Sequence, residues 1–260
     1  MQSFVDGYNN TPLDDFDGLS PVQMDNLLRG EFHEGVVRIN DSEAVYDQVP
    51  LVRMIELFLS MIDPEKGLKL TPAGYLPVAI VKALYADAPL KDDAIEAGIT
   101  KLRLEVECEP VHLTRIISEL AGYVRKQHGR LFLTRKGEAF RRQPAVLTAL
   151  LALFGGKFNL GYLDGYESPS IAQVGYPYSL YLLSKYGAEK RPETFYAEKY
   201  FRAFPQLCSD DPGRDASCYG LRTFPRFFRY FGFLTVSDPF PRPHSIRKSD
   251  LMDRFVEILA

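Results

Sequence analysis

The residue types that most often carry acid–base or metal chemistry are few in this sequence and widely spaced. The histidines are His33, His112, His128 and His244, and the cysteines are Cys108, Cys208 and Cys218. No His-x-x-x-His or His-Glu-x-x-His pattern is present, and the loop between the last two cysteines lacks the further Cys or His ligands that a zinc site needs. We therefore expect neither a metal nor a cofactor.

No arrangement typical of a catalytic site occurs either. Residues 31–34 place glutamates around a histidine, a pattern that indicates a solvated turn rather than an acid–base site. Cys108 lies between glutamates, which would raise the pKa of its thiol instead of activating it. Residues 155–157, Gly-Gly-Lys, lack the frame of a phosphate-binding loop. We expect that the protein is not an enzyme.

Basic side chains give the strongest indication of function. Residues 125–142 carry seven Lys and Arg side chains against one acid, Glu138, and a second basic group lies within residues 222–248. Both groups fall where a helix precedes a predicted β-hairpin, and cations there would contact nucleic-acid phosphates. The candidate nucleic-acid-binding residues are Arg125, Lys126, Arg130, Arg135, Lys136, Arg141, Arg226, Arg229, Arg247 and Lys248.

The charge of the chain is divided unevenly along its length. The net charge is −3, but residues 1–112 carry 20 acidic and 9 basic side chains, whereas residues 113–260 carry 14 acidic and 22 basic ones. This asymmetry favours an anionic partner for the C-terminal half. An equally good interpretation is that the two halves neutralise each other across an internal interface.

The composition indicates a folded protein that stays out of membranes. Hydrophobic residues make up 46% of the 260 residues, enough for a core without disulfides. The longest apolar run, residues 146–154, is far shorter than the roughly 20 residues that span a bilayer. The N-terminus has neither the basic start nor the apolar core of a signal peptide. We expect a cytoplasmic protein.

Capping residues and apolar spacing predict the elements that must position these side chains. Ser20, Pro21 and Gln23 form the start of a capped helix, which we expect over residues 21–28. Further predictions for the first half are a strand at 35–39, a helix from Pro50, a strand at 67–71, a helix at 76–85, a weakly periodic join at 86–109, a helix at 111–120, and strands at 122–125 and 130–134.

The C-terminal half is expected to continue in the same style. The predicted elements are a helix interrupted near Pro144 and reaching Phe154, helices at 170–186 and 192–204, a loop at 205–220, a helix at 223–230, a strand at 233–236 and a helix at 248–259. We expect two small cores. One contains Leu120, Leu131, Leu133 and Phe140, and the other contains Phe227, Phe231, Phe233 and Phe255.

Internal similarity predicts the fold class. Residues 67–74 and 130–137 share the pattern Leu-x-Leu-Thr-x-x-Gly, and residues 113–124 and 223–234 each run from a helix through a glycine into a strand. We therefore expect a mainly α protein with small β-hairpins, built from tandem winged-helix-like (helix-turn-helix) units. The predicted units are centred on residues 49–85, 111–154 and 170–259, and the corresponding domains are 1–105, 106–160 and 161–260.

Two motifs in the first third of the chain carry a resemblance. Gly18-Leu-Ser-Pro-Val-Gln-Met24 and Leu68-Lys-Leu-Thr-Pro-Ala-Gly-Tyr-Leu-Pro77 resemble a group of uncharacterised bacterial proteins with a Gly-Leu-Ser-Pro-x-Gln-Met start and a Leu-Lys-Leu-Thr-x-x-Gly-x-Leu-Pro element. The resemblance covers about residues 13–85. Some members of that group carry a Cys/His zinc-binding tail of the SEC-C type, which is not found in these 260 residues. The resemblance implies an architecture but no activity.

Two functions remain open from the sequence. The first is binding of duplex DNA or another nucleic acid through basic wings, where His128 and His244 would also lie. The second is a protein-interaction module or scaffold with the same fold. The helix ahead of the wing in the second unit carries Arg115 against Glu119 and few residues suited to reading bases, which leaves the choice between the two functions undecided.

Overall fold

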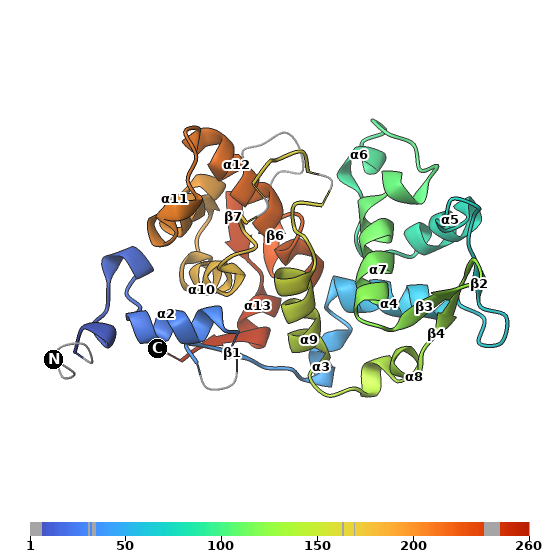
Figure 1. The fold of residues 1–260 in the computed structure, drawn as a ribbon, viewed down its shortest axis with the longest axis horizontal. Coiled ribbons are helices and arrows are strands. Elements are labelled where there is room, and N and C mark those ends of the chain that lie inside the picture. Colours follow the sequence, from blue (N-terminus) through green and yellow to red (C-terminus); the bar gives the residue numbers. More distant parts are fainter. Residues whose placement is uncertain are drawn as a thin grey trace. The chain divides into compact units, whose positions relative to one another are not determined.

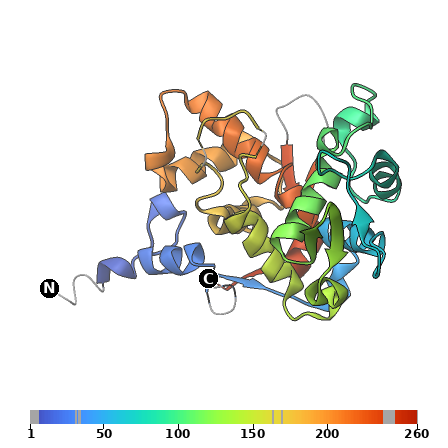
Figure 2. The same ribbon diagram turned by 45° about the vertical axis from the view of Figure 1, so that its right-hand side comes forward.

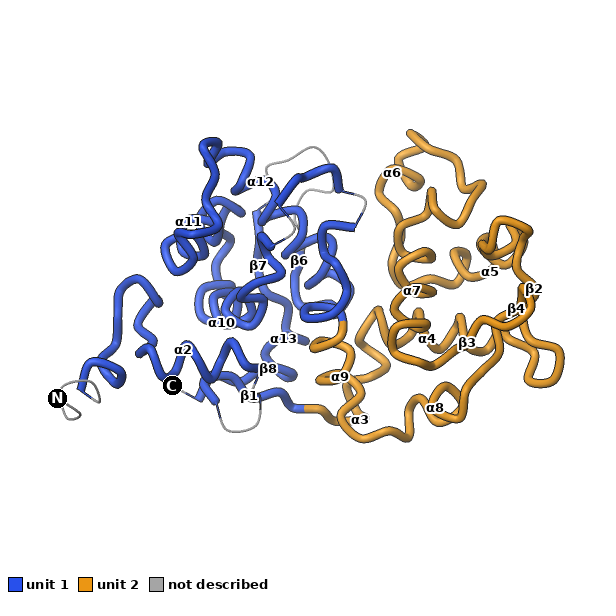
Figure 3. The backbone as a smooth tube through the Cα atoms, viewed as in Figure 1, with its two compact units in different colours: residues 1–40, 154–260 blue, residues 41–153 orange. Residues whose placement is uncertain are grey.

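The computed structural model describes residues 7–30, 32, 35–162, 164–168, 170–236 and 245–259, and it is mainly helical with small antiparallel sheets (Figure 1). The chain forms two compact units (Figure 3). Unit 1 combines residues 1–40 with residues 154–260, and unit 2 is residues 41–153. This division differs from the three consecutive segments expected from the sequence, because unit 2 lies within the chain of unit 1.

Unit 2 consists of helices around one three-stranded sheet. Its elements are α3 (Glu43–Tyr46), α4 (Pro50–Ser60), β2 (Leu68–Lys69), α5 (Val78–Ala86), α6 (Asp93–Glu96), the 3-10 turn η2 (Glu105–Glu107), α7 (Glu109–Leu120), β3 (Val124–Gln127), β4 (Arg130–Leu133), α8 (Arg135–Glu138), η3 (Phe140–Arg142) and α9 (Val146–Ala152). The strand order is β2-β4-β3, with both pairs antiparallel. The predicted helices and strands of residues 50–133 are confirmed to within a few residues.

The described residues of unit 1 form two small sheets. Its elements are η1 (Asp14–Phe16), α2 (Pro21–Leu28), β1 (Val37–Ile39), α10 (Tyr176–Tyr186), β5 (Arg191–Pro192), α11 (Glu193–Ala203), η5 (Pro205–Leu207), α12 (Pro212–Thr223), η6 (Phe228–Phe231), β6 (Leu234–Val236), β7 (Ser245–Lys248), α13 (Asp250–Phe255) and β8 (Val256–Ile258), and the π-helical turn η4 (Leu153–Lys157) leads into it. One sheet pairs β1 with β8 (Figures 1 and 2), and the other has the order β5-β7-β6.

One order of elements occurs twice. In residues 50–133, the first copy, the order is α4, β2, α5, α7, β3 and β4. In residues 176–248, the second copy, it is α10, β5, α11, α12, β6 and β7. In each copy the first strand pairs with the last strand of the hairpin, which gives the matching orders β2-β4-β3 and β5-β7-β6. The first copy carries an insertion, residues 87–108, between its second and third helices.

The strand motif that suggested a repeat has a different meaning. Leu68 pairs with Leu131, and Lys69 pairs with Arg130, so the two Leu-x-Leu-Thr-x-x-Gly stretches are neighbouring strands of one sheet. They are not equivalent parts of two units. The helix–glycine–strand pattern does recur, because Gly122 and Gly232 both precede a strand with φ near +70°.

Local capping explains where the predictions of helices succeed and fail. The Ser20 hydroxyl accepts from Gln23 N–H, and the Gln23 side chain accepts from Ser20 N–H, which confirms the capped helix α2. The predicted loop at 205–220 is wrong. Its Asp211-Pro212 pair is a helix start, because the Asp211 side chain caps Arg214 N–H and proline suits the first turn of α12.

The end of the chain also differs from its prediction. Helix α13 stops at Phe255, and Val256–Ile258 forms β8 in place of a helix to residue 259. The β-branched residues Val256 and Ile258 suit a strand, and β1 supplies the partner from far away in the sequence. No local pattern could reveal that pairing.

The two predicted small cores have different outcomes. Leu131 and Phe140 are buried, but Leu133 is half-buried and Leu120 is 53% exposed, so Leu120 does not belong to the core. The aromatic core is confirmed. Ring centroids are 5.5 Å apart between Phe227 and Phe231, 5.4 Å between Phe231 and Phe233, and 5.1 Å between Phe233 and Phe255, and all four residues are buried.

Candidate nucleic-acid interface

The hairpin β3–β4 carries exposed basic residues of unit 2. Its strands are joined by His128 and Gly129, with φ of 48° and 70°, as a tight two-residue hairpin turn requires. Arg125, Lys126 and the turn residue His128 are exposed. The hairpin therefore presents Arg125 and Lys126 to solvent beside a tight turn.

Alternation along the strands collects cations on one face of the sheet. Leu68 and Leu131 are buried on the core face, so their neighbours Lys69 and Arg130 lie on the opposite face. Arg125 lies on that outer face too, because it is paired with Phe132, two residues after Arg130. We call Lys69, Arg125 and Arg130 the basic sheet face. Each of the three strands contributes one cation to it.

The side chains of this face are held to different degrees. The Arg130 guanidinium donates to the Lys66 carbonyl at 2.8 Å, so it is partly fixed against the turn before β2. The Arg125 guanidinium lies 5.9 Å from the centre of the Phe132 ring. Lys69 and Arg125 are exposed. Among the residues that the structure describes, no carboxylate forms an ion pair with Lys69 or Arg125.

Lys126 and the helix after the hairpin lie beside this face rather than on it. Lys126 is opposite Leu131, on the other side of the sheet at its edge, and a Cβ at Gly74 would come within 2.8 Å of its Nζ. Arg135 on α8 is exposed. Lys136 is exposed as well, but its Nζ donates to the Ala121 carbonyl at 2.8 Å. The five candidates of the hairpin and α8 therefore do not share one face.

Arg141 is half-buried and is already paired with carboxylates of unit 2. Its guanidinium forms ion pairs with Glu56 and with Asp47, and NH2 lies 2.9 Å from Glu56 Oε2. Hydrogen bonds from Arg141 to Glu56 and Asp47 raise the pKa of Arg141. The side chain thereby joins η3 to α4, and its charge is compensated.

The candidates in the second copy are dispersed. Lys248 forms an ion pair with Asp253 at 2.6 Å and donates to the Ser184 carbonyl. Arg226 donates to the Tyr162 carbonyl at 3.0 Å, and Arg229 is half-buried. Of the four candidates, Arg247 on β7 is exposed. The predicted wing between β6 and β7, with His244, lies outside the described residues, as do His33 and its neighbouring glutamates.

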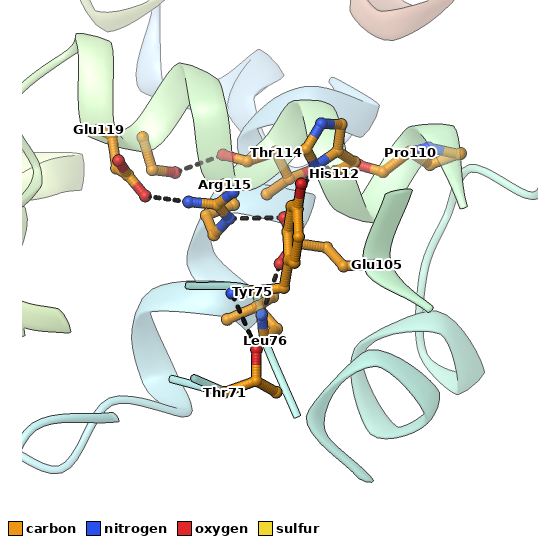
Figure 4. A network of polar contacts seen from close by, with 10 residues as sticks. Thr71, Tyr75, Leu76, Glu105, Pro110, His112, Thr114, Arg115 and Glu119 are labelled. Carbon is orange, nitrogen blue, oxygen red and sulfur yellow. Dashed lines mark hydrogen bonds and ion pairs between the residues drawn. The ribbon is translucent and has the colours of Figure 1, made fainter. Parts of the chain in front are cut away.

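A buried polar network that the sequence did not predict lies beside α7 (Figure 4). Glu105 Oε1 accepts from the Arg115 Nε at 2.5 Å and lies 2.8 Å from His112 Nδ1, while Glu105 Oε2 accepts from the Leu76 N–H at 2.5 Å. Arg115 also forms an ion pair with Glu119. The exposed fractions of Glu105, His112 and Arg115 are 1%, 4% and 8%, so the network belongs to the core of unit 2.

The charge on Glu105 is stabilised by its partners. Burial by itself would raise the pKa of Glu105, but hydrogen bonds from His112, the Leu76 N–H and Arg115 outweigh it and lower the pKa. Burial by itself would lower the pKa of Arg115, but its hydrogen bonds and charge interactions with Glu105 and Glu119 together outweigh burial and raise that pKa. Both groups therefore stay ionised in the core. Residues 86–109 look like a weakly periodic join in the sequence, which is why Glu105 was missed.

The second copy has its own buried ion pair at α12. The side chains of Arg222 and Asp164 are both fully buried, and Arg222 NH2 lies 3.2 Å from Asp164 Oδ1. Arg222 also donates to the Ile171 carbonyl at 3.1 Å, and a Cβ at Gly161 would lie 2.7 Å from its NH2. The sequence grouped Arg222 with the surface cations, but the structure places it in the core.

Two features bear on membranes and metals. No helix in the described part of the chain is long and apolar enough to cross a bilayer. Within the same ranges, no group of three or more His, Cys, Asp and Glu side chains is arranged to hold a metal ion. Cys108 and Cys218 are buried, and burial raises the pKa of both thiols, to about 12 and about 11.

Part of unit 2 is similar to a known family. No curated protein and no solved structure is detectably similar to the chain. The Gly-Leu-Ser-Pro-Val-Gln-Met motif lies outside the one matching segment, and the Leu-Lys-Leu-Thr element lies inside it. Residues 47–146, which include every element of the first copy, match the family described as the Y4jL N-terminal domain, an uncharacterised family.

Proposed function

We propose that unit 2 is a winged-helix-type module that binds nucleic acid through phosphate contacts from the basic sheet face and the β3–β4 hairpin. The observation that carries the proposal is the outer face of the sheet, where Lys69, Arg125 and Arg130 come from three different strands. Phosphate contacts need cations that solvent can reach and that lack an internal counterion. Lys69 and Arg125 meet both conditions.

The order of elements supports the same proposal. A helix, a strand, two helices and a hairpin, with the first strand paired to the last, is the arrangement of a winged-helix domain. The hairpin β3–β4 then corresponds to the wing, and α7 corresponds to the helix that precedes it. Because fold alone does not determine function, the proposal depends on the charges and not on the topology.

The test is fluorescence anisotropy of the full chain with a labelled random-sequence duplex. We expect binding at ~50 mM salt that weakens steeply as salt is raised, with a slope of about −0.9 in log–log form for each phosphate contact. The variant Lys69→Glu/Arg125→Glu should bind at least about tenfold more weakly. The magnitude of its salt slope should be smaller by roughly 1.8, because two phosphate contacts are removed.

A matched control separates local contacts from net charge. Lys101 and Arg103 are exposed in the same unit but outside the sheet, so Lys101→Glu/Arg103→Glu changes the net charge equally. We expect the control to retain nearly all of its affinity. Equal weakening by both variants would reduce the effect to net charge, and no binding by the unmodified protein at ~50 mM salt, where screening is weak, would overturn the proposal.

One observation favours the alternative, a protein-interaction module. In the insertion before α7, Ile99 is 72% exposed, Leu104 is 52% exposed and Val106 is 38% exposed. Apolar side chains gathered in one exposed segment are typical of protein-binding surfaces. If the protein fails to bind duplex, this interpretation becomes the better one, and substituting Ile99 and Leu104 with Ser should then abolish partner binding without unfolding unit 2.

A further inference from the structure

The polar side chains along the middle of α7 are bonded within unit 2. The Thr114 hydroxyl donates to the Pro110 carbonyl at 2.7 Å, and the Ser118 hydroxyl donates to the Thr114 carbonyl at 2.7 Å. Both residues are fully buried. His112 and Arg115 contact Glu105, as described above. None of these four side chains can therefore reach a base edge in this structure.

The insertion itself closes this part of α7. Glu105 comes from η2, and its carboxylate lies between the Leu76 N–H and the two basic side chains of α7 (Figure 4). The ring of Tyr75 lies 6.4 Å from the ring of His112. A carboxylate thus occupies the position that a base or phosphate acceptor would need in order to meet Arg115.

The part of α7 that solvent reaches has the wrong chemistry for reading bases. Leu120 is 53% exposed and has no polar atom in its side chain. The Glu119 side chain is 33% exposed, but it is paired with Arg115 and would be repelled by phosphates. A carboxylate can accept a hydrogen bond from a base, but that of Glu119 is already paired with Arg115. The other half-buried residues of α7, Glu109 and Ile116, supply no hydrogen-bond donor from their side chains.

We infer that the first copy recognises duplex nucleic acid by its phosphate backbone, without regard to base sequence. The inference rests on the proposed function and narrows it to a class of ligand. The basic sheet face supplies the affinity for phosphates. Helix α7 is covered, so it supplies no selectivity for base sequence. Such binding has the strength and salt dependence of non-specific complexes, whereas specific complexes are typically 10³–10⁷ tighter than those.

Any base contacts made by the second copy must be eliminated by substitution before the selectivity of the first copy is measured. The corresponding helix α12 has Arg214 and Ser217 exposed in its N-terminal half, so it could contribute base contacts of its own. In the variant Arg214→Ala/Ser217→Ala these polar groups are absent. Both side chains are at the surface, so we expect the full-length variant to fold normally.

The experiment incubates this variant with a pool of randomised duplexes and sequences the bound and unbound fractions. We expect every short sequence to be represented in the two fractions within about threefold. The further substitution Arg115→Lys, which keeps the charge, should leave that profile unchanged. A motif enriched a hundredfold, and lost on Arg115→Lys, would show that α7 reads bases and would overturn the inference while leaving the proposed function intact.

The other outcome is equally informative. If neither the unmodified protein nor the variant retains any duplex at ~50 mM salt, the proposed function fails, and the inference fails with it. A salt slope near zero in a binding protein would also contradict the inference, because backbone contacts release counterions at about 0.9 per phosphate.

Discussion

Helices α7 and α12 occupy the same place in the two copies, yet opposite ends of them are open to solvent. In α7 the buried network reaches His112 and Arg115, and Leu120 at the C-terminal end is exposed. In α12 the buried pair involves Arg222 near the C-terminal end, and Arg214 in the N-terminal half is exposed. One order of elements therefore presents two different helix surfaces.

The difference comes from the segments outside the repeated order. Glu105 belongs to the insertion 87–108, and Asp164 belongs to the stretch before α10. Each supplies a carboxylate that a buried arginine of the helix requires, because an unpaired charge in the core is costly. The position of that arginine along the helix decides which end is covered. Topology by itself does not tell which surface of such a helix can meet a ligand.

The largest effect should come from breaking the buried pair of the second copy. Arg222→Ala leaves the buried Asp164 carboxylate without its partner, so we expect a loss of about 3–5 kcal/mol in the free energy of unfolding. Urea denaturation followed by circular dichroism measures it. The exposed Arg214→Ala serves as the control and should change little. Similar losses for the two variants would show that Arg222 is not the anchor of α12.

A somewhat smaller loss is expected in the first copy. Glu105→Ala removes the shared carboxylate, but Arg115 keeps its ion pair with Glu119, so we expect about 3 kcal/mol, at the low end of the range for broken buried pairs. Glu138→Ala, at an exposed glutamate of the same unit, is the control for denaturant unfolding. A stability change below about 1 kcal/mol would mean that Glu105 does not hold the insertion against α7.

The ionised Glu105 carboxylate should make the stability of the protein depend on pH in the acid range. Its pKa in the folded protein is lowered from the ordinary value of 4.5, so its contribution to stability is present above that value and is lost as the pH falls through the folded pKa. Glu105→Gln should remove this part of the pH dependence below about pH 4.5. Thermal unfolding measured from pH 7 down to pH 3 should therefore show a shallower acid decline in the variant than in the unmodified protein.

The smallest effect is expected at the open end of α7. Leu120 is 53% exposed, so Leu120→Ala should change the free energy of unfolding by no more than about 0.5 kcal/mol. Leu131→Ala, at a fully buried position on β4, should cost about 2–5 kcal/mol by comparison. A large loss of unfolding free energy from Leu120→Ala, measured by chemical denaturation, would show that Leu120 belongs to the core, as the sequence pattern predicted.

Local signals account for the parts of the fold that the sequence predicts well. The capping box at Ser20, the apolar spacing of α4 and the turn at Gly129 each act over a few residues, and all three elements form as expected. The exposed cations of the hairpin follow from the same signals. Alternation in β3 places Arg125 on the outer face of the sheet once the hairpin turn is known.

What the sequence did not reveal depends on distant partners. Lys126 and Arg125 are adjacent in a basic run, and only the register of the sheet separates them onto two faces. Arg141 looks like another surface cation until Glu56, on a helix many residues earlier, is found beside it. Glu105 lies in a segment without periodicity, and its role becomes visible only when α7 is packed against it.

The pairing of β1 with β8 affects the order in which the two units fold during synthesis. Residues 41–153 are contiguous, and their contacts can form as soon as that stretch has been synthesised. Strand β1 has been made before them, but its partner begins only at Val256. We therefore expect unit 2 to fold during synthesis, while β1 is still without its partner strand. Pairing of β1 with β8 completes unit 1. Because these strands lie far apart in the sequence, their pairing should be the slow and late step of folding.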